Sequence, residues 1–439
     1  MLTLFLALRT PLCAQETLEQ RVERLEKLVT ELSRQLEASR TNAAPLVAAK
    51  APPSVGADTT GFTIKSGDQN FLLKIGADLQ VDNRTYSGTG SNAYTDSTLL
   101  RRVRPTFSGT VYKNIDFYFR PDFGLGTTVI YDAYLELRYW DFAKLRVGKF
   151  KPPVGLERLQ SDDDTSFVER GLPTLLVPSR DIGYQLSGNL LKHRVNYAVG
   201  VFNGVPDNSL SDASATSHRD YAARLFLTPF AGGAAENLLG GLGFGVGTTG
   251  GSVDGEALPS YKTVGQNTFV TFNSGVSEAG HRTRVAPGAY YYVGPFGLFS
   301  EYGVTEEGLQ KGAIRHEFAF RAWQVAATLI LTGERKSYFS PTPKHSFDPR
   351  NGGWGAFELA VRTGAFTSAT GLYGYGFLDP TKSPRVAREW VGGGNWYLNR
   401  LVRISIDYGN TNFTGGGASA GLNRPAERVL LTRFQINFI

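Results

Sequence analysis

The sequence predicts an all-β protein, an antiparallel barrel that spans a membrane, with one short helix ahead of it. From Phe71 to the C-terminus, apolar and polar residues alternate along successive segments, which is the period of two of a β-strand. The polar faces carry charges of both signs, as side chains around a water-filled lumen do. Aromatic residues gather at segment ends, for example Tyr139-Trp140 and Trp396-Tyr397, as in the interface girdles of membrane barrels.

The first sixty residues have other patterns. Residues 1–14 resemble the end of a secretory signal peptide, and the true start could lie further upstream. Residues 15–40 predict a coiled-coil helix, because apolar residues recur at spacings of four and three. These residues are Leu18, Val22, Leu25, Val29, Leu32 and Leu36. The alternative is a single amphipathic helix that packs on its own domain. Residues 41–60 are rich in Ala, Pro and Thr and predict a flexible linker.

Residues 61–439 form the predicted barrel domain. A soluble sandwich would also alternate, and a propeller would show a repeat of about forty residues, which is not seen here. About seventeen segments alternate, whereas bacterial barrels have even strand numbers. We therefore expect one segment within 238–273 or 315–331 not to be a barrel strand.

Composition argues against other classes of function. The net charge of +6 comes from Lys and Arg scattered along the chain, whereas nucleic-acid binding favours one basic patch. A single Cys excludes a disulfide framework and a Cys-based zinc cluster, and the five His are scattered. The glycines of 241–247 have strand spacing, which suits a crowded lumen better than a phosphate-binding loop. We expect no catalytic residue, no metal and no cofactor.

The stretch from Lys144 to Gly188 stands out from the strand array. Alternation stops at Phe150, because Pro152 and Pro153 cannot donate to a strand ladder. About thirty residues without a clear period follow, before alternation resumes at Ile182. Loops this long in a compact fold are uncommon and are usually functional.

Several stretches of the barrel region carry a family resemblance. They include RRVRPTFSGTVYKNIDFYFRPDF (101–123), VGKFKPPVGLE (147–157), ERGLP (169–173), NWYLN (395–399) and RFQINF (433–438). On these motifs the chain resembles the phosphate-selective porin O/P family of outer-membrane proteins. The resemblance implies a 16-stranded trimeric barrel in the lipid of the bacterial outer membrane, with loop 151–180 folded inward to constrict the pore. It also implies selectivity for small anions, often phosphate, and a coiled coil ahead of the barrel fits the family. A coiled coil needs partner chains, so we expect an oligomer with its helices in the periplasm, where the cell wall is a further candidate partner. Val at a and Leu at d favour two strands, which conflicts with a trimer.

The candidate pore-lining residues are cationic, because the planar fork of arginine suits oxyanions. Five lie by parity on the lumen face, one completes the family's arginine pair, and five lie at or in the loop. They are Arg102, Arg104, Arg120, Arg138 and Arg146, then Arg101, then Lys149, Lys151, Arg158, Arg170 and Arg180. Lys149 has the parity of the apolar face but sits at a strand end beside the loop. The alternative for each arginine is an ion pair with a neighbouring carboxylate.

Three adjacent carboxylates, Asp162 to Asp164, lie in the same loop. At a constriction they would repel phosphate. They could instead form a solvated acidic turn, which is the simplest expectation, bind a divalent cation, or mark a general or cation-preferring pore. The sequence thus predicts an outer-membrane channel for small anions, with phosphate or polyphosphate as candidates. A general-diffusion or cation-preferring porin, and a structural barrel anchored through its coiled coil, remain alternatives.

Overall fold

A computed structural model describes residues 17–42, 52–88, 94–212, 217–232, 238–255, 257–419 and 421–439. The chain divides into two units, Met1–Pro52 and Pro53–Ile439, and each is described by itself. The expected signal peptide, residues 1–14, lies outside the described residues. Among those that are described, no helix is both long and apolar enough to cross a membrane.

The N-terminal unit contains one helix, α1 (Leu18–Asn42). Thr17 and Gln20 form a capping box, because the backbone N–H of each donates to the side-chain oxygen of the other, at 3.1 Å from Thr17 and 3.4 Å from Gln20. The stripe of Leu and Val that predicted this helix is exposed in the single chain; Leu25 is 61% and Val29 62% exposed. The predicted helix is confirmed, whereas its coiled-coil pairing stays a prediction.

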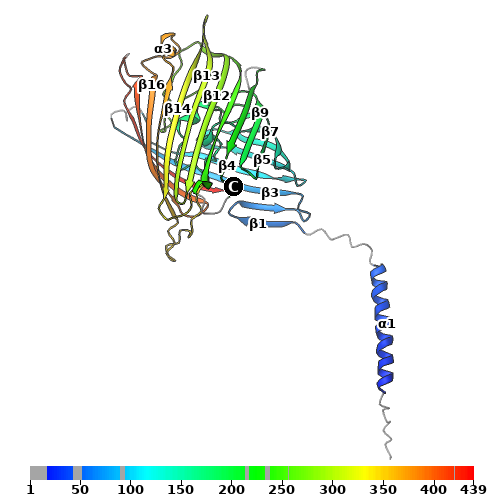
Figure 1. The fold of residues 1–439 in the computed structure, drawn as a ribbon. Helices are drawn as coiled ribbons and strands as arrows, with labels where there is room; N and C mark the ends of the chain where they lie inside the picture. The colour runs from blue at the N-terminus through cyan, green and yellow to red at the C-terminus, as the bar shows by residue number, and fades with distance from the viewer. Residues whose placement is uncertain are drawn as a thin grey trace, which may run out of the picture. The chain divides into compact units, whose positions relative to one another are not determined.

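Sixteen antiparallel strands form a closed barrel in the second unit (Figure 1). The strands are β3 (Leu72–Ser87), β4 (Ser97–Val111), β5 (Ile115–Asp122), β6 (Val129–Trp140), β7 (Ala143–Phe150), β8 (Asp181–Leu190), β9 (Val195–Phe202), β10 (Asp220–Leu227), β11 (Leu242–Asp254), β12 (Val276–Val293), β13 (Phe296–Lys311), β14 (Ile314–Ile330), β15 (Ala356–Ser368), β16 (Pro384–Tyr397), β17 (Val402–Gly415) and β18 (Glu427–Phe438). Each pairs with its neighbour in sequence, and β18 closes the barrel on β3, with Phe438 opposite Ala77. The predicted 16-stranded barrel is confirmed.

A short hairpin precedes the barrel. β1 (Ser54–Asp58) pairs with β2 (Gly61–Lys65), and β2 pairs with the first residues of β3, Leu72 to Ile75. It thus occupies the part of β3 that lies beyond the end of β18. This hairpin corrects the expectation that residues 41–60 form a linker throughout.

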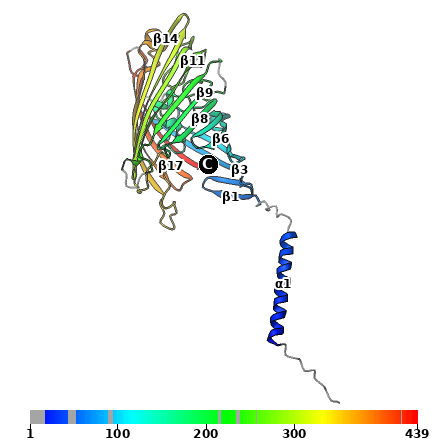
Figure 2. The ribbon, with the colours of Figure 1, turned by 45° about the vertical axis from the view of Figure 1, so that its right-hand side comes forward.

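The barrel is polar inside and apolar outside. Along β3, Asp78, Gln80 and Asp82 are buried in the lumen, whereas Leu79 between them is 38% exposed on the outer face. This is the reverse of a soluble fold and the arrangement that a lipid-facing barrel requires. The strands also differ in length around the barrel, from 18 residues in β12 to 8 in β5 and β7 (Figures 1 and 2).

The two ends of the barrel differ in their connections. Short turns such as 112–114, 141–142, 294–295 and 398–401 join strands at the end that we call the turn end. Long connections such as 151–180 and 255–275 leave the opposite, loop end. Exceptions are the connections 228–241 and 331–355, which are long although they lie at the turn end, and the two-residue turn 312–313 at the loop end. Within 255–275, residues 267–273 form isolated bridges and no barrel strand, which accounts for the odd number of alternating segments.

Candidate pore constriction

Loop 151–180 lies inside the barrel, where it packs against the lumen side of the long strands. It contains two short helical turns, α2 (Leu156–Leu159) and η3 (Leu172–Leu176). Leu176 belongs to a buried apolar cluster with Phe320 and Phe366 of β14 and β15. A carboxylate of β13 binds the start of α2, because Glu301 accepts the backbone N–H of Leu156 at 2.6 Å and of Glu157 at 3.2 Å.

Glycine makes room for the loop on the barrel wall. A Cβ at Gly247 of β11 would lie 2.6 Å from the Pro153 carbonyl oxygen and 2.8 Å from the Cα of Val154. A Cβ at Gly288 of β12 would lie 2.9 Å from the Cβ of Leu156. The glycines at strand spacing therefore serve a crowded lumen.

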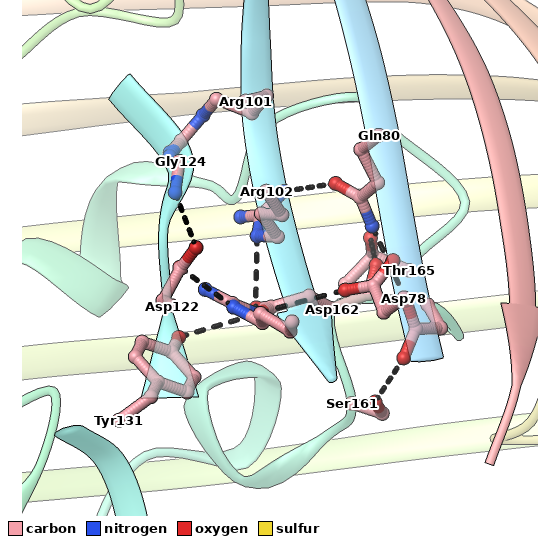
Figure 3. Close-up of polar contacts among 12 residues, drawn as sticks. Asp78, Gln80, Arg101, Arg102, Asp122, Gly124, Tyr131, Ser161, Asp162 and Thr165 are labelled. Atoms are coloured by element: carbon pink, nitrogen blue, oxygen red, sulfur yellow. Dashed lines mark hydrogen bonds and ion pairs between the residues drawn. The ribbon is translucent and has the colours of Figure 1, made fainter. Parts of the chain in front are cut away.

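Asp162 of the loop contacts three arginines, and Figure 3 shows one of them, Arg102, together with Tyr131 beside it. Its Oδ2 accepts a hydrogen bond from Arg104 Nη1 at 2.6 Å and lies 3.3 Å from Arg102 Nε, while its Oδ1 accepts one from Arg170 Nη2 at 2.6 Å. Burial alone would raise the pKa of Asp162, but Arg102, Arg170 and Arg104 hold it well below its usual range. Tyr131 Oη donates to the same carboxylate at 3.1 Å. Asp162 is thus an ionised carboxylate that offsets part of the positive charge of Arg102 and Arg104 on the wall.

The next two carboxylates are also engaged. Asp163 accepts a hydrogen bond from Gln80 Nε2 at 3.2 Å and lies 3.6 Å from Arg120. Asp164 accepts the backbone N–H of Ser340 at 2.8 Å, and burial raises the pKa of its carboxyl. Asp162 and Asp163 are only 7% and 6% exposed. The expected solvated acidic turn is therefore wrong, because the loop turns these side chains onto the barrel wall.

A second contact joins the loop to the wall at Glu169. Its carboxylate accepts hydrogen bonds from Arg101 Nε at 2.7 Å and Nη2 at 3.1 Å, and lies 3.5 Å from Arg84 and 3.6 Å from Arg433. Arg101 reaches it because the register of β3 and β4 shifts between Gln80 and Val81. Arg101 is the extra residue of this β-bulge, so it and Arg102 both turn to the lumen.

Tyr131 of β6 lies between two guanidinium groups. The Cζ of Arg104 lies 3.6 Å from the ring centroid, and the Cζ of Arg180 lies 3.8 Å from it. Such contacts stabilise both cations through the negative face of the ring. Arg180 also donates to Asp132 at 2.8 Å. The stack of Arg104, Tyr131 and Arg180 holds in place the side chains that contact Asp162.

Two cavities flank this contact between loop and wall. The loop-end cavity, about 300 Å³, has six cationic and four carboxylate side chains in its lining, among them Arg101, Arg158 and Glu169. The turn-end cavity, about 470 Å³, has four arginines, among them Arg224, together with Lys151 and two carboxylates. Asp162 lines both cavities. Each of these two cavities therefore has more cationic than carboxylate side chains in its lining.

A family comparison covers the whole barrel. The family model for phosphate-selective porin O and P matches residues 73–438. The chain belongs to this porin family. As a porin it is an outer-membrane channel protein. No curated protein sequence matches the chain.

Solved structures of low sequence identity share the fold of this porin. The outer membrane channel DcaP of Acinetobacter baumannii is 11% identical, with a TM-score of 0.55 over 86% of this chain and 100% of that one. A loop L8 deletion mutant of OmpT, an outer membrane protein of Vibrio cholerae, is 12% identical, with a TM-score of 0.52 over 84% and 99%. An anion-selective porin from Comamonas acidovorans is 11% identical, with a TM-score of 0.51 over 84% and 100%. These likenesses show the fold alone.

The predicted pore residues of the porin fall into three groups, which are the residues around the two cavities, Arg138 and Lys149. Most lie around the two cavities: Arg101, Arg102, Arg104, Arg120, Arg146, Lys151, Arg158, Arg170 and Arg180. Arg138 lies near the turn end, where its Nε is 2.5 Å from the Asp116 carboxylate, outside both cavity linings. The alternative role considered for each arginine, an ion pair with a neighbouring carboxylate, is observed for most of these arginines.

The prediction that Lys149 lines the pore must be corrected. It pairs in register with Ala133, which in turn pairs with Phe119, and Phe119 is 40% exposed on the outer face. Its Nζ donates to the Leu210 carbonyl oxygen at 2.7 Å and pairs with Asp212. Strand alternation therefore places Lys149 on the apolar outer face, although the residue lies close to the loop. Lys149 does not line the lumen cavities.

The sequence did not reveal that connection 331–355 also reaches the constriction. Tyr338 Oη donates to the Leu156 carbonyl oxygen at 2.5 Å, and Ser340 Oγ donates to that of Asp163 at 2.9 Å. No periodicity marks such contacts. Arg224 was also missed, although alternation along 219–230 could have placed it on the lumen face. Among the described residues, no three His, Cys, Asp or Glu side chains are placed to hold a metal ion.

Proposed function

We propose that this porin forms a water-filled channel that prefers small anions. The observation that carries the proposal is the cationic excess in both cavities beside Asp162. An anion path needs cations that attract the ion yet release it, and partly neutralised guanidinium groups meet both needs. Arg158 supports this, because among the described residues its guanidinium bonds to Thr174 O, Asn208 Oδ1 and Ser179 Oγ and to no carboxylate.

Phosphate is the solute that the family description suggests, and a general-diffusion pore is the second candidate. The ion pairs of Asp162 favour the second candidate, because they reduce the field that would concentrate a multivalent anion. A catalytic role has no support from the family.

Single-channel recording tests the proposal. The protein reconstituted in a planar bilayer is expected to give stepwise current in KCl. Added phosphate should reduce that current only if phosphate binds in the lumen. An absence of current would favour the alternative of a closed structural barrel.

We also propose the placement of the parts. The turn end faces the periplasm, since the short turns of bacterial barrels lie there. The chains form a trimer, as the family resemblance implies, and α1 pairs with the same helix of other copies through the exposed stripe that includes Leu25 and Val29. Mass measurement of the detergent-solubilised protein tests this, and a monomer would contradict it.

Lys151 is expected to make the ion preference depend on pH. Burial, together with the nearby Arg180 and Arg170, holds the pKa of Lys151 well below its usual range. Its Nζ donates to the carbonyl oxygens of Leu159 and Gln160. As the pH falls through this lowered pKa, Lys151 gains a proton and the turn-end cavity gains a positive charge. Anion preference should therefore rise as the pH falls.

The measurement is reversal potential from pH 10.5, the ordinary pKa of lysine, down to about pH 6, where ordinary carboxylates stay ionised. Lys151→Gln should flatten the response, whereas Lys144→Gln, at an exposed turn-end ion pair with Asp141, should not. Equal responses in the wild type and Lys151→Gln would contradict the assignment.

A further inference from the structure

The turn-end cavity has an aromatic lining that simple anion passage does not require. Four of its side chains are Tyr118, Tyr134, Phe150 and Tyr338. The rings of Tyr118 and Tyr134 stack in parallel, with centroids 5.3 Å apart and an interplanar angle of 8°. Phe150 meets Tyr134 edge-on, with centroids 6.0 Å apart. Strands β5, β6 and β7 thus place three contacting aromatic rings along this cavity.

Cations lie at the edges of that surface. The Cζ of Arg146 lies 4.3 Å from the ring centroid of Tyr134, and its guanidinium pairs with Glu136 at 2.6 Å. Arg224 of β10 donates to Asn196 and, among the described residues, has no carboxylate within ion-pair distance. Lys151 Nζ donates to the carbonyl oxygens of Leu159 and Gln160. The cavity therefore combines flat apolar faces with cations that are not fully neutralised.

This combination matches one class of solute. A guanidinium group binds a carboxylate through two parallel hydrogen bonds. An aromatic ring attached to that carboxylate gains stacking contacts with tyrosine faces and guanidinium planes. Inorganic phosphate and short aliphatic acids gain nothing from the rings. The volume, about 470 Å³, lies within the range of small-molecule sites.

We propose that the turn-end cavity is a binding subsite for planar aromatic carboxylates on the conduction path. The inference rests on the proposed anion channel and names the solute class that its turn-end half favours. The carboxylate meets Arg224 and Lys151, and the ring lies against Tyr118 and Tyr134. No bond is made or broken. The solute is held by charge and stacking and then released.

Current block by benzoate, compared with acetate, tests the inference in the full-length reconstituted protein. Both acids carry one carboxylate, and they differ in the group attached to it, a phenyl ring in benzoate and a methyl group in acetate. Benzoate added to the turn-end side should halve the chloride current at a concentration roughly tenfold lower than acetate, as stacking contacts of this kind predict. Equal potency of the two acids would overturn the inference, even with chloride selectivity intact.

Variants locate the subsite. Tyr134→Leu should bring the benzoate potency close to that of acetate, and Arg224→Gln should weaken block by both acids. Tyr139→Leu is the matched control, because Tyr139 lies on the same strand, is 55% exposed and does not line the cavity. Both acids should block this variant at the same concentrations as they block the wild type. Retained benzoate preference in Tyr134→Leu would place the site elsewhere. A channel without any anion preference would instead overturn the proposed function.

Discussion

Asp162→Asn is expected to make the channel much more anion-selective. The substitution keeps the shape of the side chain and removes the charge that offsets Arg102, Arg104 and Arg170. A unit charge about 4 Å from a passing ion changes the energy of that ion by about 1 kcal/mol in water, and by more where the dielectric constant is lower. The chloride-to-potassium permeability ratio should therefore rise roughly fivefold or more, as measured by reversal potential under a KCl gradient.

Asp164→Asn is the matched control for Asp162→Asn. Asp164 is two residues away in the same loop, forms no ion pair among the described residues, and has a pKa that burial raises. Its carboxylate accepts the backbone N–H of Ser340 and lines neither the loop-end nor the turn-end cavity, so its substitution should change the permeability ratio far less. An Asp162→Asn channel with an unchanged or lower anion preference would contradict the assigned role of the Asp162 ion pairs.

Glu169→Gln should release the tip of loop 151–180 from the wall. Burial alone would raise the pKa of Glu169, but Arg101 and Arg433 hold it below its usual range, so the carboxylate is ionised. Removing one partner of a buried ion pair costs about 3–5 kcal/mol, because the other charge is left unpaired. Hydrogen exchange of the backbone amides of residues 162–176 should accelerate by roughly a hundredfold.

Glu136→Gln is the control for Glu169→Gln. Glu136 pairs with Arg146 across β6 and β7 and does not touch the loop, so its substitution should leave the exchange of residues 162–176 unchanged. Wild-type exchange in the Glu169→Gln protein would show that the other contacts of the loop, such as those of Glu301, suffice to hold it.

The barrel could be predicted because alternation is local. Parity along β4 and β5 placed Arg102, Arg104 and Arg120 in the lumen, and the structure brings them together at Asp162 and Asp163. Parity alone does not place Arg101, since its direction depends on a bulge in the register of β3 and β4. The family motif supplied that residue.

The interior of the constriction could not be predicted in the same way. Loop 151–180 has no period, so nothing in its sequence shows that Asp162 turns toward the wall. The contacts of Tyr338 and Ser340 join segments more than 170 residues apart in the sequence. These contacts depend on how two irregular segments share the lumen, and their hydrogen bonds leave no spacing to detect.

The central claim is that excess positive charge on both sides of Asp162 makes this porin prefer anions. The most direct test is the reversal potential of the wild-type protein in a planar bilayer under a KCl gradient at neutral pH. The structure predicts a potential of the sign set by chloride. A potential of the sign set by potassium would contradict the account, because it would mean that the carboxylates, and not the arginines, control the field in the pore.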